Sequence, residues 1–218
     1  MDDAASVELF KKLLRIRTES FQGPATGAYA EAISLIREEC DAAGLSWQQH
    51  EFVEGKPVGI ATWKGEDESL PSVLLNSHYD VVPCDESEWS KDPWAADSVD
   101  GRIYGRGTQD MKCVVVQYIA AIWRLRAAGV KPLRTVHLSF VPDEEIGGVE
   151  GMALFVKTSL FKSLNVGFSL DEGLAGPEDE IPLYYGERNV FWIKVELQTK
   201  VIRRFPKISQ SIWLLNIV

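Results

Sequence analysis

The chain has 218 residues, of which 45% are hydrophobic and 25% charged, an ordinary composition for a globular domain with a core of its own. Its net charge of −9 excludes the basic surface that electrostatic binding to nucleic acid requires. Three cysteines without C-x-x-C spacing, the lack of a signal-peptide pattern and the lack of an apolar run of about 18 residues predict a cytoplasmic protein without a membrane partner.

Helix-like and strand-like patterns alternate along the chain. Apolar residues at helical spacing predict helices at 7–14, 24–43, 111–128 and 148–161. Short apolar runs bounded by turn residues predict strands at 45–53, 58–63, 73–75, 135–141, 166–170 and 190–197. This alternation predicts an α/β fold with a mostly parallel, mixed sheet that is flanked by helices.

Acidic residues and one histidine follow three of the predicted strands directly. These residues are His78 and Asp80, then Asp143, Glu144 and Glu145, then Asp171 and Glu172. Asp110 stands just before the helix predicted from residue 111. Because sites in open α/β sheets form at the carboxyl ends of strands, we expect these side chains to meet in one crevice. An imidazole with several carboxylates is a donor set that suits zinc, cobalt or manganese.

Each of these groups also has a purely structural explanation. A single histidine after a strand is usually structural, and Asp110 is in an ordinary position for a helix N-cap. Acidic residues after a strand often form a solvated cap or turn. It is the occurrence of four such groups at element ends that favours a metal site. Asp80, two residues beyond His78, is then suited to accept the second imidazole N–H.

Four segments resemble, in order, the metal-binding motifs of the M20 family of di-zinc amidohydrolases and peptidases. They are NSHYDVVP at 76–83, YGRGTQDMK at 104–112, VPDEEIGG at 141–148 and SLDEG at 169–173. Within the family, Cys113 after the Asp-Met-Lys sequence, Gln109 and the segment 88–94 are similar to the aminoacylase branch. The similarity covers roughly residues 5–198.

The resemblance implies a ligand set for zinc. His78, Asp110 and Glu172 would hold one ion, and Asp110 would bridge to a second ion held by Glu145. Glu172 is preferred to its neighbour Asp171 because the aminoacylase branch uses the glutamate before the glycine. The resemblance also implies a cis peptide bond after Asp110.

The resemblance further implies the chemistry. Glu144 would be the general base, and Asp80 would orient His78. The expected reaction is hydrolysis of an N-acyl-L-amino acid, a small-molecule substrate, to a carboxylate and a free amino acid. Alternatives are a related M20 dipeptidase or deacetylase, and a non-enzymatic truncated isoform that binds one zinc ion.

The similarity to the family stops near Thr199. Residues 1–199 are therefore expected to be an incomplete catalytic domain, and residues 200–218, which have four basic and no acidic residues, an unrelated tail. The family's lid and dimerisation domain, its oxyanion-binding histidine and its last metal-binding histidine have no counterpart, since no histidine follows His137. Members of the family are homodimers with two zinc ions per subunit. For this chain we expect one zinc ion, and low solubility and activity.

Overall fold

The computed structural model describes residues 1–173, 182–184 and 186. All of its helices and strands precede residue 171, within the unit Met1–Ala175. The strand predicted at 190–197 and the tail predicted at 200–218 lie outside the described residues. Within the described part of the chain, no helix is both long and apolar enough to cross a membrane.

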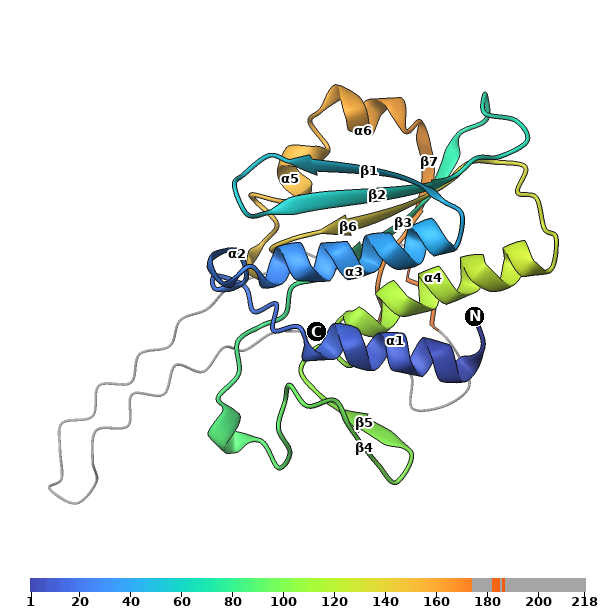
Figure 1. Cartoon of the computed structure of the whole chain (residues 1–218). Coiled ribbons are helices and arrows are strands. Elements are labelled where there is room, and N and C mark those ends of the chain that lie inside the picture. Colours follow the sequence, from blue (N-terminus) through green and yellow to red (C-terminus); the bar gives the residue numbers. More distant parts are fainter. Residues whose placement is uncertain (174–181, 185, 187–218) are drawn as a thin grey trace, which may run out of the picture. The chain divides into compact units, whose positions relative to one another are not determined.

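A five-stranded mixed sheet forms the centre of the fold, in the order β1-β2-β6-β3-β7 (Figure 1). The strands are β1 Ser46–Glu51, β2 Pro57–Trp63, β3 Ser72–His78, β6 Val136–Val141 and β7 Val166–Leu170. β1, β2 and β6 pair antiparallel, whereas β3 pairs parallel with both β6 and β7. The prediction of a mixed sheet flanked by helices is confirmed. The carboxyl ends of β3, β6 and β7 lie at the same edge.

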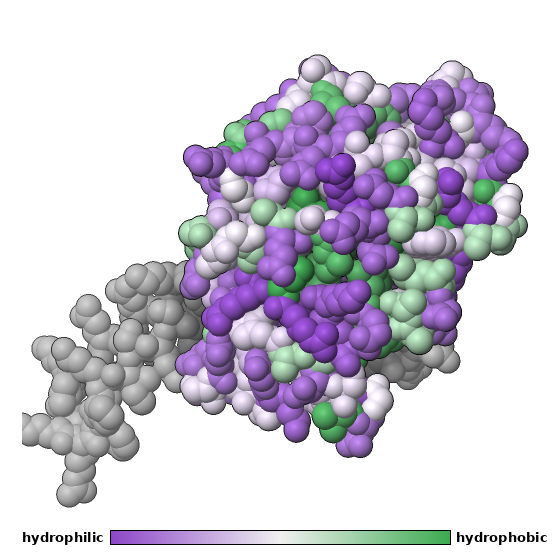
Figure 2. All heavy atoms as spheres, viewed as in Figure 1, coloured by the Kyte–Doolittle hydropathy of each residue, from purple (hydrophilic) through white to green (hydrophobic). Residues whose placement is uncertain are grey.

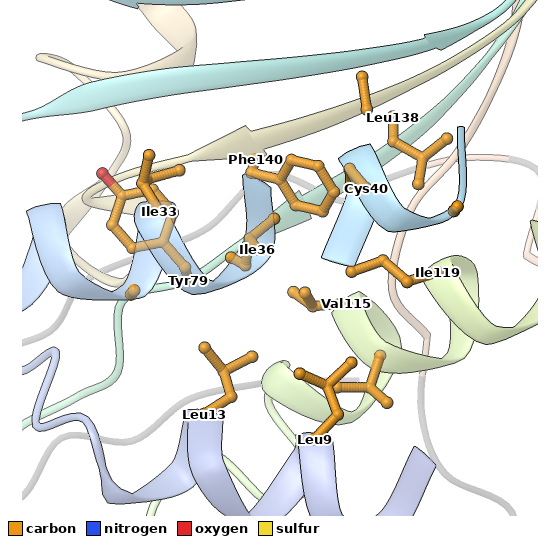
Figure 3. Packing of buried hydrophobic residues seen from close by; sticks show 14 of the residues in the cluster. Leu9, Leu13, Ile33, Ile36, Cys40, Tyr79, Val115, Ile119, Leu138 and Phe140 are labelled. Atoms are coloured by element: carbon orange, nitrogen blue, oxygen red, sulfur yellow. The ribbon is translucent and has the colours of Figure 1, made fainter. Parts of the chain in front are cut away.

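Helices cover both faces of this sheet. On one face lie α1 (Asp3–Arg15), α3 (Ala28–Ala42) and α4 (Lys112–Ala127), and on the other lie α5 (Met152–Phe155) and α6 (Ser159–Ser163). Side chains of α1, α3 and α4 pack with Leu138 and Phe140 of β6 in the larger hydrophobic cluster (Figure 3). Phe155 of α5 packs in a second cluster with residues of β2 and β6. Figure 2 shows a mostly hydrophilic outer surface on the face in view, with hydrophobic residues visible between the helices.

Two predicted helices are each divided into two elements. The helix predicted at 24–43 is wrong as one element, since Gly27 (φ 79°) separates α2 (Gly23–Thr26) from α3. The helix predicted at 148–161 is also wrong as one element. The chain passes Gly147 (φ 93°) and Gly148 (φ 62°) before α5 begins, and residues 156–158, which contain no glycine, separate α5 from α6. Left-handed backbone of this kind is available to glycine at little steric cost, and it ends a helix.

A small hairpin was not predicted from the sequence. It consists of β4 (Asp97–Val99) and β5 (Arg102–Tyr104), which pair antiparallel. Its two turn residues, Asp100 and Gly101, have φ of 50° and 76°. Positive φ at both central positions is the requirement of a type I′ turn, for which Asp-Gly is a preferred sequence.

Candidate metal centre

Three side chains from separate elements converge at the carboxyl ends of β3 and β7. His78 is the last residue of β3, Asp110 precedes α4, and Glu172 follows β7 by two residues. His78 Nε2 lies 3.0 Å from Asp110 Oδ1 and 3.6 Å from Glu172 Oε1. One ligand atom from each of the three lies within 4.8 Å of the others. One imidazole nitrogen and two carboxylate oxygens at this spacing fit a zinc ion, whose bonds to such ligands are about 2.0–2.2 Å.

The neighbours Asp171 and Glu172 have different surroundings. Asp171 Oδ2 accepts a hydrogen bond of 2.7 Å from the side-chain amide of Asn76, and its backbone oxygen accepts one from Tyr118 Oη. Glu172 instead turns its carboxylate towards His78. This geometry favours Glu172 as the ligand. Burial is the main cause of the raised pKa of Glu172.

His78 is held with one ring nitrogen towards the other ligands. The ring is buried, and its Nδ1 lies 3.0 Å from the backbone oxygen of Asp80 and 3.3 Å from the Asp80 carboxylate. Because a carbonyl oxygen can only accept, Nδ1 carries the hydrogen in the neutral ring, and Nε2 offers its lone pair to a metal. Burial lowers the pKa of His78, but hydrogen bonds to the surrounding carboxylates, Asp110 first, raise it well above its ordinary value. The carboxylates that keep His78 protonated by their negative charge would also attract a metal cation.

The carboxylate of Asp80 joins three segments of the chain. It is fully buried and accepts hydrogen bonds from Ser20 Oγ at 2.8 Å, from the backbone amide of Glu144 at 3.1 Å and from that of Glu145 at 3.2 Å. Asp80 therefore links the end of β3 to the turn η2 (Glu144–Ile146) as well as orienting His78.

The two glutamates of η2 differ in their contacts. Glu144 Oε2 lies 3.7 Å from His78 Nε2, whereas Glu145 Oε1 accepts a hydrogen bond from the backbone amide of Val82 at 3.3 Å. Burial raises the pKa of both residues, and for Glu145 the charge of Asp110 adds to it, so that its pKa is about 7. Both side chains thus lie beside the three-residue group without belonging to it.

Asp110 is not a helix cap, so the structural explanation of this residue is wrong. The N-cap position of α4 is Met111, which makes no side-chain capping bond, and the Asp110–Met111 peptide is cis. Met111 is buried, and its Sδ accepts the backbone N–H of His78 at 3.2 Å. The hydrogen bond to His78 lowers the pKa of Asp110. Asp110 is thereby held next to His78.

Lys112 is a buried residue of the motif to which sequence reasoning assigned no role. Its Nζ donates to the backbone oxygens of Leu13 at 3.0 Å and Ile16 at 2.7 Å, at the C-terminal end of α1. A cation there complements the helix dipole, and it adds a second hydrogen bond to carbonyls that also accept the backbone amides of Ile16 and Thr18. Burial lowers its pKa to about 7. The start of α4, and with it Asp110, is therefore attached to α1. The position of this lysine in the Asp-Met-Lys sequence was the available signal.

The fold and the ligand group together define an α/β domain with a candidate metal-binding site at the carboxyl edge of its sheet. The model of peptidase family M20/M25/M40 matches residues 74–184, about half of the chain, and the chain belongs to this family. The chain is 47% identical to aminoacylase-1 of Sus scrofa over 191 residues, which are 87% of this chain and 46% of that protein. With aminoacylase-1 of Homo sapiens the identity is 45% over 196 residues, 89% of this chain and 47% of the other.

Solved structures show the same fold. An M20 family metallo-carboxypeptidase from Sulfolobus solfataricus, Sso-CP2, matches with a TM-score of 0.67 and 27% identity over 80% of this chain and 38% of the other. Human carnosine dipeptidase 1 matches with a TM-score of 0.69 and 23% identity over 79% of this chain and 39% of the other. The chain spans about half the length of the curated relatives it matches.

Proposed function

We propose that this chain carries the first zinc site of an aminoacylase, an enzyme that hydrolyses N-acyl-L-amino acids to a carboxylate and a free L-amino acid. The observation that carries the proposal is the meeting of His78, Asp110 and Glu172 within 4.8 Å. The 47% identity to an aminoacylase-1 supports the choice of substrate class. The substrate is a small molecule, and neither nucleic acid nor membrane is a partner.

The residues present suggest how the reaction would proceed. Zinc, when bound, would polarise the acyl carbonyl and lower the pKa of a water molecule. Glu144 would take a proton from the attacking water and deliver it to the amine nitrogen as the C–N bond breaks. The hydroxyl remains on the acyl carbon, and the carboxylic acid so formed gives its proton to the released amine or to solvent and leaves as the carboxylate. Burial raises the pKa of Glu144, which suits a residue that must both accept and return a proton.

We propose one tightly bound zinc ion for this chain by itself. Its three-residue group offers a complete set of protein ligands for one ion, while a second ion would have only Asp110 and Glu145. Structural zinc sites have four ligands, and catalytic zinc sites have three with one open position. A second ion would therefore bind more weakly. We further propose a cytoplasmic location, which the three free cysteines support.

The alternative is a related M20 peptidase. A probable carboxypeptidase S-like protein of Dictyostelium discoideum is 44% identical to this chain over 96 residues. Hydrolysis of N-acetyl-L-methionine compared with hydrolysis of a dipeptide separates the two functions. Turnover of the dipeptide alone would overturn the aminoacylase proposal. A chain that binds one zinc ion and hydrolyses neither would support the non-enzymatic alternative.

The division of roles is tested with single variants and zinc analysis. We expect His78→Ala to lose zinc from this chain, whereas Glu144→Ala keeps it. In the full-length Sus scrofa relative, replacing the glutamate equivalent to Glu144 should remove turnover and leave the zinc content nearly unchanged. Asp171→Asn is the matched control, because Asp171 is bound to Asn76. Equal loss of zinc in the Glu144 and Glu145 variants would contradict the proposed division.

A further inference from the structure

The turn that carries Glu144 and Glu145 begins with an unusual backbone conformation. Asp143, the residue before η2, has φ of 62° and ψ of 24°. This left-handed region is unfavourable for a residue with a Cβ atom, although aspartate tolerates it better than most. Asp143 also makes no side-chain capping bond to the turn. Its backbone oxygen accepts the amides of Ile146 and Gly148, so within the turn only the backbone of Asp143 is held. Its side chain depends on partners outside the turn.

The carboxylate of Asp143 is held by two residues distant in the sequence. It is buried, and its Oδ1 accepts a hydrogen bond of 2.8 Å from the hydroxyl of Tyr29 in α3. Its Oδ2 pairs with the ammonium group of Lys56, just before β2. Lys56 also pairs with Glu150 at 2.6 Å, and its side chain is 14% exposed. Both carboxylate oxygens are thus occupied, so Asp143 is not available as a metal ligand.

Tyr29 is itself fixed by packing. It is fully buried and contacts the ring of Tyr79 edge-on, with 5.1 Å between the ring centroids. The hydroxyl of Tyr79 donates to the backbone oxygen of Pro57 at 2.7 Å, next to Lys56. Figure 3 shows the side chain of Tyr79 next to α3, which carries Tyr29. The anchor of Asp143 is therefore built into the core and into the start of β2.

The two sides of the turn are held by different partners. Lys56 and Tyr29 hold the side chain of Asp143, while Asp80 accepts the backbone amides of Glu144 and Glu145. The left-handed conformation at Asp143 is what directs these two consecutive amides to one carboxylate. Release of Asp143 would therefore loosen the hydrogen bonds to Asp80.

We propose that Lys56 and Tyr29 are positioning residues: through Asp143 they hold the turn that presents Glu144 and Glu145 to the metal centre. Neither residue touches the metal-ligand group. The effect of Lys56 and Tyr29 on zinc binding rests on the proposed function, because it requires Glu145 to contribute to ion binding. Their effect on the conformation of the turn does not depend on that function.

Amide hydrogen exchange of the metal-free chain tests the effect on the turn. We expect faster exchange at the amides of Glu144 and Glu145 in Lys56→Met and in the milder variant Tyr29→Phe. The acceleration should be about 10- to 100-fold, which corresponds to the protection lost when a buried hydrogen bond to a charged group is weakened. Amides in β3 and α4 should be unaffected. Lys64→Met is the matched control, because Lys64 pairs with Glu68 and both side chains are exposed.

Unchanged exchange at the two amides in Tyr29→Phe and Lys56→Met would overturn the proposal. So would equal acceleration throughout the chain, because it would mean a general loss of stability. If Lys56→Met does not fold, Tyr29→Phe alone decides, since it removes a single hydroxyl.

A double-mutant cycle on zinc affinity tests the link to the site. Lys56→Met should weaken the binding of the second, weaker zinc ion, which Glu145 would hold, in the wild-type background. It should weaken it much less in a Glu145→Gln background, because the anchor acts through the turn. Equal weakening in both backgrounds, or none in either, would overturn the link. If the wild-type chain binds no zinc, the proposed function fails, while the exchange experiment still decides whether Lys56 and Tyr29 hold the turn.

Discussion

Replacing Glu145 with glutamine is expected to stabilise the metal-free chain at neutral pH, although the residue lies beside the metal centre. Burial and the charge of Asp110 raise the pKa of Glu145 from an ordinary value of 4.5 to about 7. Each pH unit of this difference corresponds to about 1.4 kcal/mol, which gives an upper limit of about 3.5 kcal/mol. Because Glu145 is only partly buried, solvent screening reduces the effect, and we expect the ionised carboxylate to lower the free energy of unfolding by about 1–3 kcal/mol. Glutamine is neutral and retains an oxygen that can accept the amide of Val82.

The pH dependence identifies the cause. Because the pKa of Glu145 is higher in the folded chain, the destabilisation is absent below pH 4.5, grows as the pH rises, and is complete above about pH 7. Urea unfolding of both proteins with a chelator, at about pH 5 and about pH 8, measures the difference. Glu145→Gln should be more stable by up to about 3 kcal/mol at the higher pH and by less than about 1 kcal/mol at the lower.

A matched control is Glu8→Gln, since the side chain of Glu8 in α1 is 64% exposed. It should change the stability by less than about 0.5 kcal/mol at either pH. An equal gain for Glu145→Gln at both pH values would show that charge is not the cause. A loss of stability at the higher pH would refute the reasoning, because it would mean that the Glu145 carboxylate is stabilised in the metal-free fold.

Three further outcomes are expected. Glu172→Gln should weaken zinc binding, measured by chelator competition, more than about 100-fold. Loss of a group that only supports a ligand typically weakens it by about 10- to 100-fold, and Asp171→Asn should have a smaller effect than Glu172→Gln. Zinc affinity should rise by up to about tenfold per pH unit near neutrality. The reason is that the raised pKa keeps His78 protonated, so that zinc must displace a proton from the ring. An affinity that does not change with pH would contradict this. Gly151→Ala should lower the free energy of unfolding by about 1–3 kcal/mol, since its Cβ would lie 2.2 Å from the backbone oxygen of Pro142.

Much of the sheet could be predicted from the sequence. The strand predicted at 166–170 coincides with β7, and the other predicted strands in the described part differ from the observed ones by a few residues at their ends. The strands β2, β3 and β6 are mostly buried and have this clear signal because both of their faces require apolar side chains, whereas β1 and β7 are mostly exposed. The grouping of His78 with Glu172 was predictable too, because neighbouring parallel strands deliver their last residues to one edge.

Local backbone conformation was less predictable. The apolar spacing of 24–43 continues across Gly27, but the helix does not, because a positive φ at one glycine outweighs the pattern. The helix predicted at 148–161 likewise divides into α5 and α6, although no glycine lies at the break between them. The sequence contains the glycines without showing which of them take the left-handed conformation.

The supports of the site were decided by tertiary structure alone. Asp171 and Glu172 are chemically similar neighbours, and it is the amide of Asn76 that binds one of them and leaves the other facing His78. Tyr29 and Lys56 reach Asp143 from 114 and 87 residues away, through contacts that no local pattern encodes. The sequence by itself determined most strands of the central sheet and the acidic residues and histidine that follow them. The tertiary structure decided which carboxylates are already bound to other groups and which remain to hold a metal, because that depends on partners brought together only by folding.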